Sequence, residues 1–142
     1  VRFLELMPVG EGANPQLAER YVDLTRVRHR LADQYGLTPR SGLPGNGPAR
    51  YWQVPGAAGV IGFITPISDR YCDTCSRFRL SSTGELRPCL AYEVNVPLRD
   101  AIRARDEALL EARFNSAAAL KPMGHEWTAG GITKIRMSRI GG

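Results

Sequence analysis

Residues 72–89 read CDTCSRFRLSSTGELRPC and contain all three cysteines of the chain, Cys72, Cys75 and Cys89. Turn-forming residues at 81–85 separate two short runs that suit strands, 78–80 and 86–90, so the stretch predicts a β-hairpin. Such a hairpin would fold Cys89 back beside Cys75. The spacing therefore indicates a metal site with three thiolate ligands.

A metal site with three protein ligands differs from a structural zinc site, which is closed by four. The fourth metal position stays open for a substrate or a water molecule, and this indicates binding or chemistry at the metal. Zinc and iron both accept thiolate ligands, so the cysteines alone do not decide between the two metals.

Length and composition indicate one soluble globular domain, since the 142 residues are 43% hydrophobic and 23% charged. No apolar run approaches the roughly 18–20 residues of a membrane span, and we therefore do not expect this chain to be a membrane protein. An odd cysteine count with a C-x-x-C pair and no apolar signal segment is typical of a reducing compartment. These features predict a cytoplasmic protein.

The charge pattern favours anionic ligands. The formal net charge is +5, and all but two of the nineteen cationic side chains are arginines, which suit two-pronged binding of phosphate groups. Arg77 and Arg79 alternate around Phe78 on a predicted strand that directly follows Cys75. Both guanidinium groups would therefore flank the open metal position.

Predicted strands and helices are mixed along the chain, which indicates an α+β fold. A helical stretch over 17–35 ends at Gly36; it is either one helix or two, with Thr25 capping the second. Residues 38–48 are expected to form a long connection, and Trp52 is expected in the core. The other expected elements are a strand over 2–7, a strand pair over 50–54 and 59–65, and helices over 98–103 and 107–120.

The second of those late helices carries a partly apolar stripe, which should pack against the rest of the domain. Residues 121–142 mix glycine, proline and basic residues and predict no core. They form either a frayed end or a tail whose Gly141 and Gly142 thread a narrow pocket, because glycine permits close backbone approach. The stripe consists of Ala108, Leu109, Ala112, Ala117 and Leu120.

Several segments together resemble the C-terminal part of the GTP 3′,8-cyclase family, the radical S-adenosylmethionine (SAM) enzymes that open molybdenum cofactor biosynthesis. The cysteine and arginine residues of 71–79 are the most specific part of this resemblance. The other segments are 2–7 with Val9 and Gly10, 62–64 with Pro66, 80–90, and the terminal Ile140, Gly141 and Gly142.

The resemblance implies that Cys72, Cys75 and Cys89 hold a 4Fe–4S cluster, the second of two in the family, whose fourth iron faces GTP. It implies an incomplete α/β (TIM-like) barrel as the parent fold. Residues 1–10 would be the last part of this barrel, and 11–142 a C-terminal cluster and substrate domain in which the antiparallel hairpin carries the second cluster. Partners missing from the chain would leave apolar surface exposed.

Roles for other residues also follow from the resemblance alone. Arg77, Phe78 and Arg79 would contact the nucleotide, and Arg2 would reach the substrate from the end of a barrel strand. Leu4 would lie near the adenosyl group of SAM. Gly141 and Gly142 would reach into the active site and, with Arg77 and Arg79, take part in catalysis.

The family converts GTP to (8S)-3′,8-cyclo-7,8-dihydroguanosine 5′-triphosphate after SAM is cleaved at a first cluster, held by a CxxxCxxC motif. This chain has no cysteine beyond the three described, so we expect it to be inactive alone and to be a piece of a longer protein. The implied partners are GTP and the N-terminal half of the barrel. A homodimer is left open, and no membrane or nucleic-acid partner is expected.

A small structural zinc module is the alternative. His125 or Asp73 would supply the fourth ligand, and the basic face would touch nucleic acid. The sequence contains no recognisable nucleic-acid-binding motif. A lone histidine such as His125 is more often a surface residue than a ligand.

Overall fold

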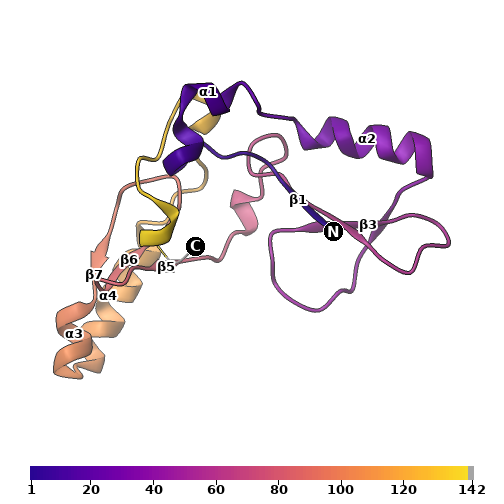
Figure 1. Cartoon of the computed structure of the whole chain (residues 1–142). Helices are drawn as coiled ribbons and strands as arrows, with labels where there is room; N and C mark the ends of the chain where they lie inside the picture. Colours follow the sequence, from indigo (N-terminus) through magenta and orange to yellow (C-terminus); the bar gives the residue numbers. More distant parts are fainter. Residues whose placement is uncertain (141–142) are drawn as a thin grey trace. The chain divides into compact units, whose positions relative to one another are not determined.

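The computed structural model describes residues 1–140, which fold into two compact units (Figure 1). Unit 1 contains residues 1–7 and 19–75, and unit 2 contains residues 8–18 and those from 76 onward. The predicted mixture of helices and strands is confirmed. Within residues 1–140, no helix has the length and apolar character required to cross a membrane.

A four-stranded sheet in the order β1-β4-β3-β2 forms the base of unit 1. Strand β1 pairs parallel with β4, whereas the other neighbours are antiparallel, and this confirms the strand pair expected near 50–54 and 59–65. β1 is shorter than the predicted 2–7 because its partner ends just before Pro66, which has no N–H for a ladder. The strands are β1 (Arg2–Leu4), β2 (Thr38–Arg40), β3 (Arg50–Gln53) and β4 (Ile61–Ile64).

Strand β2 was not predicted, since 38–48 was expected to be a connection. Its Pro39 lies opposite Trp52 of β3 at the edge of the sheet, where a missing N–H can be tolerated. The opposite edge is β1, on which Phe3 and Leu4 are exposed. The expectation that missing partners leave apolar surface exposed stays a prediction.

The helical stretch consists of two helices, α1 (Pro15–Ala18) and α2 (Leu24–Tyr35). The predicted cap of the second helix was wrong by two residues. Asp23 is the cap, because its carboxylate accepts from the backbone N–H of Thr25 at 2.8 Å, and the Thr25 hydroxyl donates to the same oxygen. These bonds lower the pKa of Asp23. Gly36, with φ of 65°, ends the helix as predicted.

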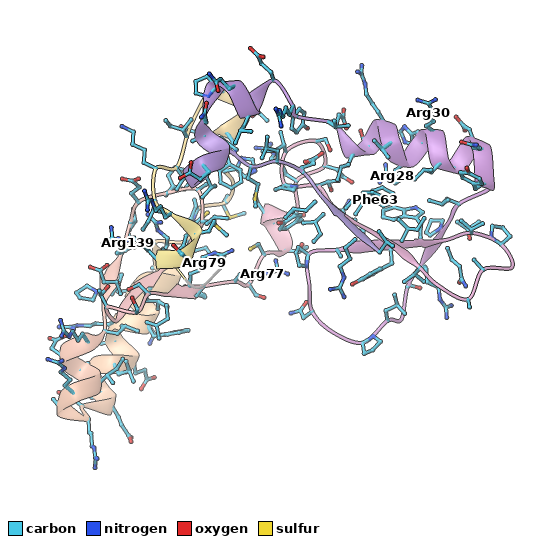
Figure 2. The ribbon with its side chains drawn as sticks, viewed as in Figure 1. Arg28, Arg30, Phe63, Arg77, Arg79 and Arg139 are labelled. Atoms are coloured by element: carbon cyan, nitrogen blue, oxygen red, sulfur yellow. The ribbon has the colours of Figure 1, made fainter. Side chains whose placement is uncertain are left out.

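The core of unit 1 lies between α2 and the sheet. Phe63 is 1% exposed and is buried together with Leu24 and Leu37. Trp52 packs edge-on against Phe63, with ring centroids 5.4 Å apart, so its predicted place in the core is confirmed. Figure 2 shows Phe63 and Arg28 on the side of α2 that faces the strands, whereas Arg30 points away.

Unit 2 combines a three-stranded antiparallel sheet with two helices. Its core consists of Leu86, Val96, Leu98 and Ala117. The predicted hairpin and the two predicted helices are confirmed. The elements are β5 (Arg79–Leu80), β6 (Glu85–Arg87), β7 (Val96–Pro97), α3 (Arg99–Ala104) and α4 (Glu107–Ala119), with 3₁₀ helices η1 (Gly10–Ala13), η3 (Trp127–Ala129) and η4 (Met137–Arg139).

The turn of the hairpin depends on Gly84. Its φ of 80° is a conformation that favours glycine, and a Cβ there would lie 2.9 Å from the Cβ of Arg99. The Ser81 N–H donates to the Glu85 carbonyl at 2.9 Å and closes the turn. The turn chemistry in the sequence therefore identified the hairpin correctly.

The predicted apolar stripe on α4 was wrong, because Ala117 is its buried member while Leu109 and Leu120 are exposed. Arg113 lies beside Leu110 and Ala117, which form the packed face of α4. Its guanidinium binds both carboxylate oxygens of Asp100 on α3 and donates to the Pro97 carbonyl at 2.7 Å. This ion pair lowers the pKa of Asp100 to about 2.

The C-terminal segment is packed up to residue 140, so the prediction of a frayed end without a core was wrong for residues 121–140. Thr133 is fully buried and makes three hydrogen bonds within unit 2: its amide donates to the Pro8 carbonyl, its carbonyl accepts from the Gly10 amide, and its hydroxyl donates to the Ala91 carbonyl. Ile140 is 2% exposed. The predicted tail residues Gly141 and Gly142 lie outside the described residues.

Candidate functional site

Cys72 and Cys75 lie on a single tight turn of unit 1. The 3₁₀ helix η2 (Cys72–Thr74) ends at Cys75, whose amide donates to the Cys72 carbonyl at 3.2 Å. In a 3₁₀ helix, side chains three residues apart lie on the same side, so this turn favours presenting both thiols together. Both cysteines are half-buried thiols.

The chain that leads to this turn is held by the buried carboxylate of Glu5, which is 2% exposed. One carboxylate oxygen accepts from the backbone amides of Ile67 and Ser68, at 2.8 and 3.0 Å. The other accepts from the Leu24 amide, the Tyr21 hydroxyl and the Ser68 hydroxyl. Glu5 therefore joins the end of β1, the start of α2 and the segment before Cys72.

Tyr21 should ionise later than an ordinary tyrosine. Burial, together with the charges of Glu5 and Asp23, raises the pKa of its phenol from 10.0 to about 12. The neutral phenol is favoured in the folded state, so its contribution to stability is intact below about pH 10 and is lost as the pH rises through about 12. Ultraviolet difference absorbance should show a late tyrosine step near pH 12, and Tyr21→Phe should remove it. A late step of unchanged size in Tyr21→Phe would contradict this prediction.

Cys89 follows β6 in unit 2, and the neighbouring backbone is fixed by Lys121. The Lys121 ammonium donates to the carbonyls of Pro88 and Arg77, both at 2.7 Å, and lies 5.2 Å from the centre of the Phe78 ring. The two carbonyls flank the open end of the hairpin, one before β5 and one after β6. Lys121 therefore holds the residue before Cys89 beside the beginning of the hairpin.

Arg77, Phe78 and Arg79 line a pocket of 260 Å³ together with Leu80 and Ile140. The predicted alternation along a strand holds only for Arg79, because β5 begins there and Arg77 precedes it. Both arginines nevertheless line the pocket. Arg79 donates to the Ile140 carbonyl at 3.4 Å, and Figure 2 shows Arg79 and Arg139 in the same part of unit 2.

Arg87 is buried at the end of β6, with 2% of its surface exposed. Its Nε and Nη1 atoms have no hydrogen-bond partner among the described residues. Burial lowers the pKa of the guanidinium, while Glu93, Cys89 and Glu85 raise it and Arg79 lowers it. The spacing that singles out Arg77 and Arg79 in the sequence does not extend to Arg87.

Arg2 and Leu4 lie on the edge strand β1. The Arg2 Nε donates to the Tyr51 hydroxyl at 3.0 Å, and Gly62 between them leaves the space that both side chains need. Leu4 is 54% exposed. Their predicted roles toward substrate and SAM stay predictions.

The three cysteines are divided between the two units: Cys72 and Cys75 lie in unit 1, and Cys89 lies in unit 2. Within each unit, the described residues contain no group of three or more histidine, cysteine, aspartate or glutamate side chains suited to one metal ion. The predicted approach of Cys89 to Cys75 therefore stays a prediction, as does the division into 1–10 and 11–142.

The two side chains considered as a fourth zinc ligand have structural roles here. Asp73 is exposed, and its carboxylate accepts from the Thr74 amide at 3.0 Å. His125 is 7% exposed and packs against the Trp127 ring at 4.4 Å, so its expected place on the surface was wrong.

Comparison with known proteins gives a family match over residues 1–127, to the model described as Molybdenum Cofactor Synthesis C. Two similar curated relatives are the GTP 3′,8-cyclases of Petrotoga mobilis, 40% identical, and Moorella thermoacetica, 39% identical; each match covers 100% of this chain and 44% of the relative. The GTP 3′,8-cyclase of Paracoccus denitrificans is 38% identical over 99% of the chain and 42% of its own length. The chain thus spans less than half the length of these relatives.

Proposed function

Because the chain belongs to the Molybdenum Cofactor Synthesis C family, we propose that it is the C-terminal part of a GTP 3′,8-cyclase. The complete enzyme would convert GTP to (8S)-3′,8-cyclo-7,8-dihydroguanosine 5′-triphosphate with SAM as cosubstrate. The observation that carries this proposal is the identity of about 40% across the whole chain to proteins with that activity. The incomplete α/β barrel of the parent enzyme is part of the same proposal.

The residues of this chain fit a 4Fe–4S cluster as a ligand set. All three cysteines are half-buried thiols, and thiolates are the usual ligands of such clusters. Cys72, Cys75 and Cys89 would hold the cluster, and when bound it would supply an open iron that anchors the purine as a Lewis acid.

The neighbouring arginines have the chemistry to orient the nucleotide. Arg77 and Arg79 line one pocket with Phe78, and a guanidinium binds phosphate oxygens through two parallel N–H bonds. Lys121 fixes the backbone at Arg77, and this restricts the positions that the Arg77 side chain can reach. Arg2 would approach the substrate from β1. Roles for Leu4 toward SAM and for Gly141 and Gly142 at the active site are proposed from the family resemblance.

The chain cannot supply the SAM-cleaving step by itself, because it lacks the CxxxCxxC motif of the first cluster. We assign that step to a barrel part outside this sequence. The chain's own task would be to bind GTP and to hold it in one orientation.

The test is anaerobic iron–sulfur reconstitution of the protein expressed from its complete gene, followed by electron paramagnetic resonance with GTP or ATP. GTP should change the spectrum of one cluster, whereas ATP, with a different purine edge, should change it much less. Arg79→Gln should weaken the GTP response by about tenfold, the loss expected for one charge-assisted contact, and Arg103→Gln on the exposed part of α3 should not. Bound zinc with no response to GTP would overturn the proposal.

A further inference from the structure

Arginines lie opposite each other on the hairpin of unit 2. Arg79 of β5 and Arg87 of β6 are register partners in an antiparallel pair, so their side chains are on the same face of the sheet. Like charges directly opposite each other destabilise a sheet. The hairpin therefore concentrates positive charge on one face, and something must offset it.

The charge on Arg87 cannot be removed by loss of a proton, because arginine stays protonated in proteins. A buried guanidinium without partners is costly. The carboxylates of Glu85 and Glu93 attract it, but neither Nε nor Nη1 has a bonded partner within residues 1–140. These two nitrogens of Arg87 therefore lack a hydrogen-bond acceptor, and an anion would be the most effective acceptor for them.

Arg87 lines a pocket of 360 Å³ whose rim includes Arg139, Asn95 and the hydroxyl residues of the hairpin turn. The Ser81 hydroxyl accepts from the Glu85 amide at 3.0 Å and shares a hydrogen with the Thr83 hydroxyl at 2.8 Å. One of these two hydroxyls therefore keeps a hydrogen that it can donate to a ligand. The carboxylate of Glu85 also lines the pocket, but the two arginines outweigh its charge.

We propose that this pocket is an oxyanion site that binds a phosphate group, with Arg87 as its buried cationic anchor and Arg139 as its exposed second cation. Phosphate suits the donor set because several donors of different geometry, two guanidinium groups, a hydroxyl and the Asn95 amide, surround one volume. The site is separate from the Arg77–Arg79 pocket, although Ile140 lines both. It goes beyond the proposed reaction and does not depend on the cluster.

The phosphate group could come from free inorganic phosphate or polyphosphate, or from the phosphate chain of a nucleotide. Titration calorimetry on the protein expressed from its complete gene, at constant ionic strength, should use phosphate, pyrophosphate, triphosphate and GTP. Competition between triphosphate and GTP that is present in the wild type and lost in Arg87→Gln would identify the nucleotide as the source. Independent binding would identify a free anion.

Variants decide whether the pocket is the site. Arg87→Gln should weaken phosphate or polyphosphate binding by at least about tenfold, the loss expected for one charge-assisted contact, and Arg139→Gln by about threefold because it is exposed. The matched control Arg103→Gln, an exposed arginine of unit 2, should leave binding unchanged. Unchanged affinity in both Arg87→Gln and Arg139→Gln, or an equal loss in Arg103→Gln, would overturn the proposal.

A thermal measurement covers the case in which Arg87→Gln folds poorly. Arg87→Met removes the buried charge, so without phosphate it should melt no lower than the wild type. Added polyphosphate should raise the melting temperature of the wild type and of Arg103→Gln but not that of Arg87→Met. If Arg87→Met melts lower and polyphosphate has no effect on the wild type, Arg87 has a structural role alone and the proposal fails.

Discussion

Replacing Cys89 with serine should remove about four iron atoms per molecule from the reconstituted protein, because a cluster held by three thiolates loses one of its ligands. Serine has nearly the same shape as cysteine, but its hydroxyl does not ionise near neutral pH to replace a thiolate. The GTP-dependent spectral change should disappear together with the iron. Iron and sulfide analysis beside electron paramagnetic resonance would measure both losses.

Ser76→Ala is the control for Cys89→Ser, since Ser76 is an exposed residue next to Cys75. It should keep the full iron content. A Cys89→Ser protein with unchanged iron and an unchanged response to GTP would contradict the proposed role of the cysteine.

Replacing Glu5 with glutamine should destabilise unit 1 by about 3 kcal/mol or more, since each buried donor left unpaired costs about 1–3 kcal/mol. The Glu5 carboxylate is the acceptor in all five of its hydrogen bonds, whose donors lie on Tyr21, Leu24, Ile67 and Ser68. A glutamine amide must turn its NH₂ group toward one set of these donors, whichever way it is placed. The amides of Ile67 and Ser68 or the Leu24 amide would then lose their acceptor.

Urea unfolding and hydrogen exchange at the Ile67, Ser68 and Leu24 amides would measure this effect. Glu19→Gln makes the same chemical change at an exposed position of unit 1 and should alter the unfolding free energy by less than about 0.5 kcal/mol. Glu5→Gln should also speed exchange in the segment that leads to Cys72. Equal stability of the two variants would show that the Glu5 network is replaceable.

Local sequence signals predicted the parts of the fold that depend on local chemistry. The hairpin followed from turn residues, and Gly84 proved to be the residue that the turn requires. The end of α2 followed from Gly36 for the same reason. The cap at Asp23 was missed because Thr25 has equally suitable chemistry, and the two side chains bond to each other.

The errors arose where contacts distant in sequence decide the structure. Residues 121–140 have a composition without a core, yet Thr133 is buried by bonds to Pro8, Gly10 and Ala91, which no local pattern reveals. The packed face of α4 carries Leu110 and Ala117, whereas the predicted stripe centred on Leu109 and Leu120, and the local apolar pattern does not distinguish these neighbouring faces.

In the candidate site, the cysteines and the arginine pair could be selected from their spacing alone. Glu5, Arg87 and Lys121 could not, because a single charged residue in a sequence is most often exposed. Their importance depends on burial, which only the folded chain shows. An isolated glutamate or arginine inside an otherwise apolar predicted strand, as at Glu5 and Arg87, is the weak signal that could have identified two of them.

Lys121 closes the hairpin segment into a ring through hydrogen bonds. Its ammonium joins the carbonyls of Arg77 and Pro88, so the chain between them is tied at both ends without a covalent bond. A tied segment has less conformational freedom to lose when it binds a ligand, and preorganisation of this kind strengthens binding. Modification of one lysine amine, by acetylation for example, would reopen the ring and loosen the residue that precedes Cys89.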